Sequence, residues 1–265
     1  MSEARKTSRR AGLIRIVPAL VFAMILLAWE ALVRQRGIPP YILPAPSLIA
    51  QTLVADWDVL SAALWQTLRT TFLALFLATA GGLALALVFA RWRIVEASLF
   101  PIAVILQVTP IIAIAPLLLV YLEPHTAVLV CAFIVAFFPI LSNAVLGLRS
   151  VDRNLIELYQ LYGASPSQEL RLLRLPSALP YFLGGLRIGG GLALIGAIVA
   201  EIAAGAAGQG AGLAFRIAEA GYRLNIPRMF AALVLVSATG VAIYMLFSAL
   251  SRLLLGRWHD SEANG

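Results

Sequence analysis

The chain has 265 residues, of which 61% are hydrophobic and only 12% are charged. Soluble domains carry about 25% charged residues, so a water-soluble globular protein is excluded and an integral membrane protein is expected. The net charge of +7 is attributed to arginines beside the membrane, because basic residues gather on the cytoplasmic side of membrane proteins. Nucleic-acid binding is therefore not expected. A single cysteine and two distant histidines predict neither a disulfide nor a metal site.

Six apolar stretches are long enough to cross the membrane as helices, which takes about 20 residues each. They are 14–33, 64–90, 97–122, 126–148, 179–204 and 230–254. The first resembles a signal peptide, but its length and the lack of a small-residue cleavage site favour a retained span. Spanning strands would be about ten residues long with alternating polarity. The sequence therefore predicts an all-α membrane protein with six transmembrane helices.

The Lys and Arg residues outside these spans are concentrated on one side. This side carries the basic N-terminus and the polar segment between the fourth and fifth spans. The bias predicts that both termini and this segment are cytoplasmic. The expected division is a tail over 1–13, a transmembrane domain over 14–254 with a cytoplasmic loop over 149–178, and a second tail over 255–265.

Two segments away from the cytoplasmic side, and one span, have distinctive composition. The segment 37–53 has four prolines and then an amphipathic stretch, and 203–227 is Gly-rich before a weakly helical stretch. The segment 203–227 is expected to hold a loop and a short helix on or partly within the outer face. The third span contains Pro101, Pro110 and Pro116, each of which removes a backbone donor. This helix either faces protein or a water-lined path, or is merely kinked.

The stretch "ELYQLYGASPSQELRLLRLPSALP" is the polar segment between the fourth and fifth spans. Gly163 is a plausible helix stop, and Ser165 can cap a second helix with Pro166 at its first position. That second helix is expected to end before Leu175 and Pro176. The Tyr and Leu residues on one face predict docking of a soluble partner, with a helix pair lying on the lipid surface as the alternative.

The spacing in this stretch resembles the loop of bacterial ATP-binding-cassette importer permeases. That loop reads Glu-Ala-Ala, three residues, Gly, nine residues, Ile-x-Leu-Pro. All spacings match here, with Leu158 and Tyr159 in place of the alanines and Leu173 in place of isoleucine. The resemblance implies contact with the ATPase through Glu157, Leu158, Tyr159, Gly163, Ala164, Ser165, Leu173, Leu175 and Pro176.

Other segments resemble the nitrate, sulfonate and taurine branch of this family, which includes importers of pyrimidine-type vitamin precursors. They are "YILPAPSLIAQTL", "FFPILSNAVLGLRSVD" and "LPYFLGGLRIGGGLALIGAIVAEI". The resemblance implies a type I importer permease in the bacterial inner membrane. The implied partners are a second permease copy, two cytoplasmic ATP-binding subunits and a periplasmic binding protein. The chain lacks a Gly-x-x-x-x-Gly-Lys-Ser/Thr phosphate-binding loop, so ATP and Mg are expected to bind to the partner ATPase. This chain is expected to bind no cofactor and to have no enzymatic activity.

The expected function is ATP-driven import of a small polar or anionic nutrient of the nitrate, sulfonate or taurine type, or of a pyrimidine-type vitamin precursor. An ion-coupled transporter would need paired intramembrane acids and inverted repeats, and a membrane enzyme would need a catalytic constellation at membrane depth. Polar residues within spans are candidates for the translocation path, because they are costly in lipid. These are Gln107, Thr109, Asn143 and Glu201.

Three of the four path candidates have an alternative. Glu201 could be a helix-end acid that pairs with Arg216 or Arg223, and Gln107 and Asn143 could form hydrogen bonds between helices. The glycines of the fifth span are expected to allow close packing, near the axis of a permease dimer.

Overall fold

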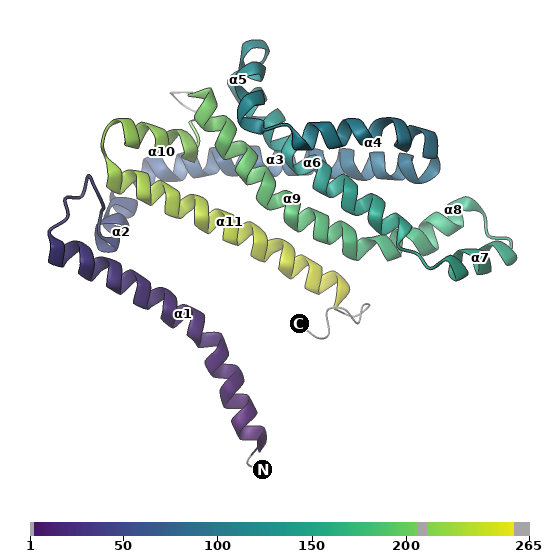
Figure 1. Cartoon of the computed structure of the whole chain (residues 1–265), viewed down its shortest axis with the longest axis horizontal. Coiled ribbons are helices and arrows are strands. Elements are labelled where there is room, and N and C mark those ends of the chain that lie inside the picture. The colour runs from purple at the N-terminus through teal and green to yellow at the C-terminus, as the bar shows by residue number, and fades with distance from the viewer. Residues whose placement is uncertain (1–2, 206–210, 257–265) are drawn as a thin grey trace. The chain divides into compact units, whose positions relative to one another are not determined.

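The computed structural model describes residues 3–205 and 211–256, and within these ranges every regular element is a helix (Figure 1). The chain divides into two compact units. One consists of Met1–Leu60 with Arg216–Val234, and the other of Ser61–Phe215 with Leu235–Gly265. Residues 1–2 of the predicted tail 1–13, residues 257–265 of the predicted tail 255–265, and the loop residues 206–210 lie outside the described residues.

The predicted spans are confirmed as apolar helices. Within the described ranges, five helical segments are long and apolar enough to cross a membrane, or six if one bent pair counts as a span. The single helices are α1 (Glu3–Arg36), α3 (Trp57–Arg91), α6 (Pro124–Arg149), α9 (Leu175–Ala204) and α11 (Ile226–Leu255). The bent pair is α4 (Arg93–Val108) and α5 (Ile111–Tyr121).

The bend in the third span lies at Pro110. The axes of α4 and α5 differ by 99°. Thr109 takes an extended conformation with φ −68° and ψ 124°, as expected for a residue before proline. Pro101 and Pro116 stay inside α4 and α5. Of the three prolines singled out in the sequence, one therefore breaks the helix and two are accommodated within it.

In the unit that contains α1, polar contacts hold the short segments. The amphipathic stretch noted in 37–53 forms the short helix α2 (Pro46–Ala55), which begins at the fourth proline. Glu30 on α1 accepts hydrogen bonds from the Ser47 backbone N–H at 3.0 Å and from its hydroxyl at 2.7 Å. Asp56 forms a bidentate ion pair with Arg228 at 2.6 and 2.8 Å. The hydrogen bonds of Glu30 join α1 to the start of α2, and the ion pair joins the end of α2 to the start of α11.

In the other unit, α6 and α9 lie side by side over most of their length (Figure 1). Glycines make this approach possible. A Cβ on Gly147 would lie 2.8 Å from the Ala178 Cα, and one on Gly196 would lie 2.9 Å from the Ala132 Cα. At such distances the two backbones are in direct contact, so any side chain at these positions would force the helices apart.

Most glycines of the fifth span pack against other helices of this chain, whereas the sequence predicted packing near the axis of a permease dimer. Gly185 and Gly189 face α6, while Gly190 faces Ile243 and Phe247 on α11. A Cβ on Gly184 or Gly191 would have no heavy atom within 4 Å. Only these two leave an open face on α9, and contact with a second copy stays a prediction.

The loop after α6 begins as predicted. It contains α7 (Arg153–Leu161) and α8 (Pro166–Glu169). Gly163 has φ +73°, a conformation that favours glycine. Ser165 caps α8 in a capping box with Gln168, and Pro166 is at the first position.

The predicted end of the second helix before Leu175 is wrong. α8 continues through a π-helical turn, η1 (Leu170–Arg174), directly into α9. The Leu175 N–H donates to the Leu170 carbonyl, five residues back. Pro176 lies in the first turn of α9, where proline is tolerated, and the wider π turn gives its ring room. The loop and the fifth span therefore form one continuous helical segment, Pro166–Ala204.

Replacing Gly147 with Ala is expected to lower the thermal stability of the purified protein in detergent. The new methyl would meet the Ala178 backbone at 2.8–2.9 Å, and overpacking of this kind costs about 1–3 kcal/mol. Gly184→Ala is the matched control, because its Cβ has free space. Equal unfolding temperatures for the two variants would show that the glycine contact does not hold α6 to α9.

Candidate functional site

The tip of the loop between α6 and α9 exposes large apolar side chains. Leu161 is 84% exposed and Tyr162 is 85% exposed. Beside them is a hollow of about 340 Å³ whose walls come from both short helices and the turn. Its lining residues are Leu158, Tyr159, Tyr162, Gly163, Ala164, Gln168 and Leu172. An apolar tip next to a hollow is the shape of a surface that inserts into a partner.

Hydrogen bonds fix the shape of this tip. The Asp152 carboxylate accepts from the Asn154 N–H at 2.8 Å at the start of α7. Within the turn, Gly163 N–H donates to Gln160 O and Ala164 N–H donates to Tyr159 O, both at 3.0 Å. The turn is therefore held by its own backbone as well as by the cap on α8.

The predicted coupling residues divide into two groups. Leu158, Tyr159, Gly163 and Ala164 line the hollow, and Ser165 caps α8 beside it. The other four stand elsewhere. Glu157 forms an exposed ion pair with Arg153 at 3.1 Å, Leu173 is buried, Leu175 packs against a core cluster, and Pro176 is exposed in α9. Leu173 and Leu175 thus anchor the base of the loop.

At the other end of α9, a buried carboxylate caps a helix. Glu201, only 7% exposed, accepts from the Thr67 hydroxyl at 2.9 Å and from the Ala214 N–H at 3.1 Å. The Leu213 N–H donates to the Thr67 oxygen at 2.9 Å. Leu213 and Ala214 begin α10 (Leu213–Tyr222), so α3 and α9 together satisfy two of the free N–H groups at its start.

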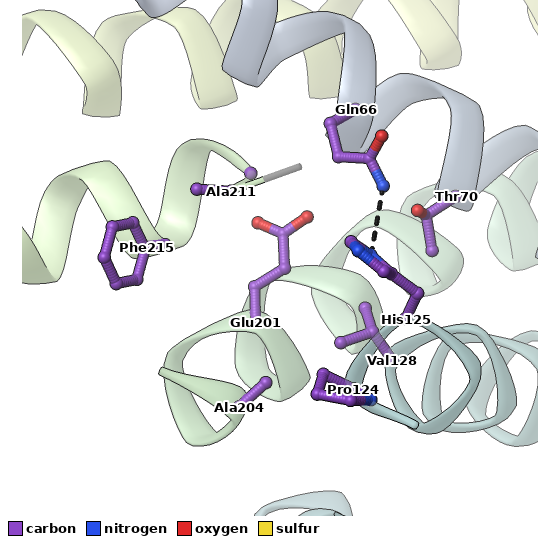
Figure 2. Close-up of a pocket in the computed structure, with 10 residues that line it drawn as sticks. Gln66, Thr70, Pro124, His125, Val128, Glu201, Ala204, Ala211 and Phe215 are labelled. Carbon is purple, nitrogen blue, oxygen red and sulfur yellow. Dashed lines mark hydrogen bonds between the residues drawn. The ribbon is translucent and has the colours of Figure 1, made fainter. Parts of the chain in front are cut away.

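The approach of the chain to this carboxylate requires glycine at position 212. A Cβ on Gly212 would overlap the carboxyl group of Glu201. Figure 2 shows the carboxylate directed past Ala211 toward α3, with Gln66 and His125 nearby. The predicted short helix in 203–227 is thus confirmed as α10, and its start is fixed by a residue of the fifth span.

Polar side chains line the space next to Glu201. Gln66 and His125 are within hydrogen-bond distance, at 3.4 Å (Figure 2). They border both a small cavity of about 20 Å³ at Glu201 and a larger hollow of about 400 Å³. The larger hollow is lined by Gln66, Arg69, Thr70, Leu73, His125, Thr126 and Leu129. We call the larger hollow the polar recess; Glu201 lines the small cavity, which shares Gln66, Thr70 and His125 with it.

Sequence reasoning singled out Glu201 but missed its neighbours Gln66, Thr67 and His125. A signal was present, because positions 66, 67, 69, 70 and 71 put five polar residues into two turns of an otherwise apolar span. Such residues usually face protein or water. His125 carried no such signal, since it begins a helix and meets Gln66 only in the folded chain.

Glu201 is hydrogen-bonded within its own unit of the chain, and an ion pair with Arg216 or Arg223 stays a prediction. Its hydrogen bonds go to Thr67 and Ala214. Arg216 and Arg223 both pair with Glu219, at 2.8 and 2.9 Å. The hydrogen bond from Arg216 lowers the pKa of Glu219, so this acid is charged near neutral pH.

The other path candidates lie in different surroundings. Gln107 and Thr109 are exposed at the bend between α4 and α5, and the Thr109 hydroxyl donates to Ile105 O at 2.7 Å. Asn143 donates its amide to Pro139 O of its own helix at 2.8 Å and lies against Gly185. A path lined by these residues together with Glu201 stays a prediction.

Thr67→Val is expected to loosen the start of α10. The variant removes the donor to Glu201 and leaves the buried Leu213 N–H without its acceptor, which costs about 1–3 kcal/mol. Faster hydrogen exchange at Leu213 and Ala214 is the expected readout.

Thr71→Val is the matched control for this substitution. Thr71 lies one turn along α3, is equally buried, and its hydroxyl has no hydrogen-bond partner among the described residues. This variant should exchange like the unmodified chain at these two amides. If both variants exchange alike, Thr67 does not hold α10.

Comparison with known proteins identifies relatives along most of the chain. Residues 78–259 match the family model described as "Binding-protein-dependent transport system inner membrane component". The riboflavin transport system permease protein of Chloroflexus aurantiacus is 36% identical over 249 residues, which cover 90% of this chain and 88% of that protein. The formylaminopyrimidine transport permease protein of Halalkalibacterium halodurans is 32% identical over 243 residues, covering 90% and 94%.

Two further comparisons agree with these. The taurine transport system permease protein of Escherichia coli is 29% identical over 245 residues, covering 89% of this chain and 87% of that protein. A chain of the methionine ABC transporter, solved in inward-facing conformations, matches with a TM-score of 0.64 at 22% identity. That match covers 75% of this chain and 97% of the solved one, and it shows a shared fold.

Proposed function

The chain belongs to the family of binding-protein-dependent transport system inner membrane components, and we propose that it forms the path of an ATP-driven importer. It is a multi-pass inner-membrane permease of the ABC type. In this proposal a periplasmic binding protein delivers a small nutrient to it. ATP and Mg are bound by two cytoplasmic ATPase subunits, and this chain supplies no catalytic residue.

The exposed tip around Leu161 and Tyr162 carries the proposal. Burying a large apolar side chain contributes about 1.5–3 kcal/mol, so two such residues beside a shaped hollow favour insertion into a groove. We assign the contact to Leu158, Tyr159, Gly163, Ala164 and Ser165. Leu173 and Leu175 anchor the base of the loop, while Glu157 and Pro176 are exposed on either side of it.

The same segment offers a route for mechanical coupling. Pro166–Ala204 is a continuous helical segment of 39 residues, which at 1.5 Å per residue spans about 60 Å. A push on α8 therefore acts on α9 directly. Because α9 and α6 touch through their backbones, the two helices respond as one body. ATP-driven closure of the partner subunits would reach the transmembrane region by this route.

The bend at Pro110 supports a second permease copy. Gln107, Thr109 and Pro110 are exposed, and Val108 is 74% exposed. Backbone groups freed at such a bend are not tolerated against bare lipid, but they are tolerated against protein or water. We propose that this face meets a second copy along the path, with Gln107 and Thr109 lining it. Asn143 and Glu201 bind within their own chain and contribute to the path by shaping it.

The orientation proposed from the arginine distribution puts both termini and the loop 149–178 in the cytoplasm. The tails 1–13 and 255–265 then flank a transmembrane domain over 14–254. The polar recess around Gln66 and His125 falls on the periplasmic side in this arrangement. It would meet the substrate before the bend at Pro110.

The transported compound is proposed from the relatives. Nitrate, sulfonate and taurine were the first expectation, with a pyrimidine-type vitamin precursor as the alternative. The relatives named for riboflavin and formylaminopyrimidine are 36% and 32% identical, against 29% for the one named for taurine. This order favours a nitrogen heterocycle of the vitamin type. Ligand binding to the cognate binding protein would test the choice, and a taurine-specific protein would reverse it.

Gly163→Asp is expected to leave the protein inserted in the membrane but to weaken copurification of the ATPase. An aspartate at φ +73° strains the turn by about 1 kcal/mol or more and adds charge to the apolar tip. The measurement is the ATPase recovered with the tagged permease, together with transport in vesicles.

Gly37→Asp provides the control, since Gly37 also has positive φ (+60°) and free space for a Cβ. It carries the same strain and charge away from the loop, so ATPase recovery should be normal. Normal recovery and transport with Gly163→Asp would rule out docking through this tip.

The orientation is tested by cysteine labelling. In a Cys131→Ala background, a cysteine replacing Ser167 should react on intact cells only with a reagent that crosses the membrane. A cysteine replacing Tyr41, which is 62% exposed in the segment after α1, should react with an impermeant reagent. The reverse pattern would invert the proposed topology.

A further inference from the structure

Four arginines converge on one cavity beside the base of the coupling loop. The cavity has a volume of about 450 Å³ and lies between the ends of α3, α4, α6 and η1. Its basic lining residues are Arg91, Arg93, Arg149 and Arg174. They come from four elements, so the cluster exists only in the folded chain. The docking tip around Tyr162 has a separate hollow with different lining residues.

Two of these arginines are neutralised and two are not. Arg149 pairs with Glu96, and Arg174 pairs with Glu169 at 2.6 Å. Arg91 and Arg93 are exposed; Arg91 stacks on the Trp92 ring at 5.9 Å, and neither forms an ion pair within the described residues. The cavity therefore keeps an excess of two positive charges, held by arginines whose guanidinium groups bind phosphate oxygens well.

The surroundings of the cavity are those of a membrane interface. Trp92 is 54% exposed, and Ile94 on the first turn of α4 is 83% exposed. Tryptophan is enriched at the level of lipid headgroups. About two helical turns further along α4, Ile102 is 53% exposed, so apolar surface continues from the mouth of the cavity along this helix. A basic hollow with apolar surface leading away from it matches a charged headgroup and its acyl chain.

We propose that this cavity binds the phosphate headgroup of an anionic phospholipid of the cytoplasmic leaflet. Basic pockets between transmembrane helices on this side are suited to such headgroups. Arg91 and Arg93 would bind the phosphate, while Arg149 and Arg174, fixed by their acids, shape the pocket. The proposal rests on the proposed function in one respect, namely that the end of the helices with the coupling loop is cytoplasmic.

The site joins the lipid to the coupling segment. Arg174 belongs to η1, the turn between α8 and α9, and Arg149 ends α6. A headgroup in the cavity would therefore contact the two helices that carry the loop. The expected consequence is that anionic lipid holds the base of the loop in its docking position and raises ATP-driven transport.

The test measures lipid binding to the full chain. Purified permease is titrated with phosphatidylglycerol or with phosphatidylcholine, and retained lipid is counted by native mass spectrometry. The affinity of Arg91→Gln/Arg93→Gln for phosphatidylglycerol should be about 30-fold lower, since each basic residue near an anionic surface raises the binding affinity about fivefold. The control Arg36→Gln/Arg252→Gln removes the same charge at two exposed arginines and should bind like the unmodified chain.

Other outcomes would overturn the proposal. Equal retention of the two lipids, or equal loss in both double variants, would show that no specific headgroup site exists. Displacement of phosphatidylglycerol by millimolar inorganic phosphate would assign the site to a soluble anion. If Arg91→Gln/Arg93→Gln instead loses the ATPase while keeping the lipid, the cavity is a protein contact.

The result is separable from docking through the loop. Gly163→Asp should leave phosphatidylglycerol retention unchanged even where ATPase recovery falls. Failure of docking with retained lipid binding would contradict the proposed function alone. Loss of lipid selectivity with normal docking would contradict the lipid site alone.

Discussion

Direct backbone contact between α6 and α9 is the constraint on which the rest of the protein depends. Gly147, Gly185 and Gly196 bring the two helices so close that added Cβ atoms would lie 2.8–2.9 Å from atoms across the contact. In lipid there is little hydrophobic force between helices, and close packing of this kind replaces it. Both the coupling loop and the polar recess beside Glu201 are attached to this pair, at opposite ends of α9. The pair therefore fixes the position of each functional region.

The buried carboxylate of Glu201 fulfils a second structural requirement. A short helix that begins next to the membrane leaves N–H groups without partners, and α10 gives two of its own to Glu201 and Thr67. Burial of an acid is costly unless hydrogen bonds compensate it. Here the compensation ties α3, α9 and α10 together, and polar Gln66 and His125 extend from the same point into the recess. The same few residues therefore hold the three helices together and make the recess polar.

Much of this architecture was predictable, because length, polarity and turn chemistry are local properties. The spans, the positive φ of Gly163 and the cap at Ser165 all followed from short stretches of sequence. Contacts between distant residues were not predictable in this way. Thr67 and Glu201 meet only after folding, and so do the four arginines of the inner cavity. The π turn also escaped prediction, since Pro176 signals a helix end locally, while the wider turn before it accommodates the ring.

The π turn at Leu170–Arg174 has a geometric consequence for the loop. Each α-helical residue turns the chain by about 100° around the axis, and a π turn holds one more residue than an α turn of the same height. The direction in which Tyr162 and Leu161 project around the axis of α9 therefore depends on the one extra residue in the π turn. In a relative with an identical tip but an ordinary α-helical turn at this position, the two side chains would project in another direction, toward a differently placed ATPase.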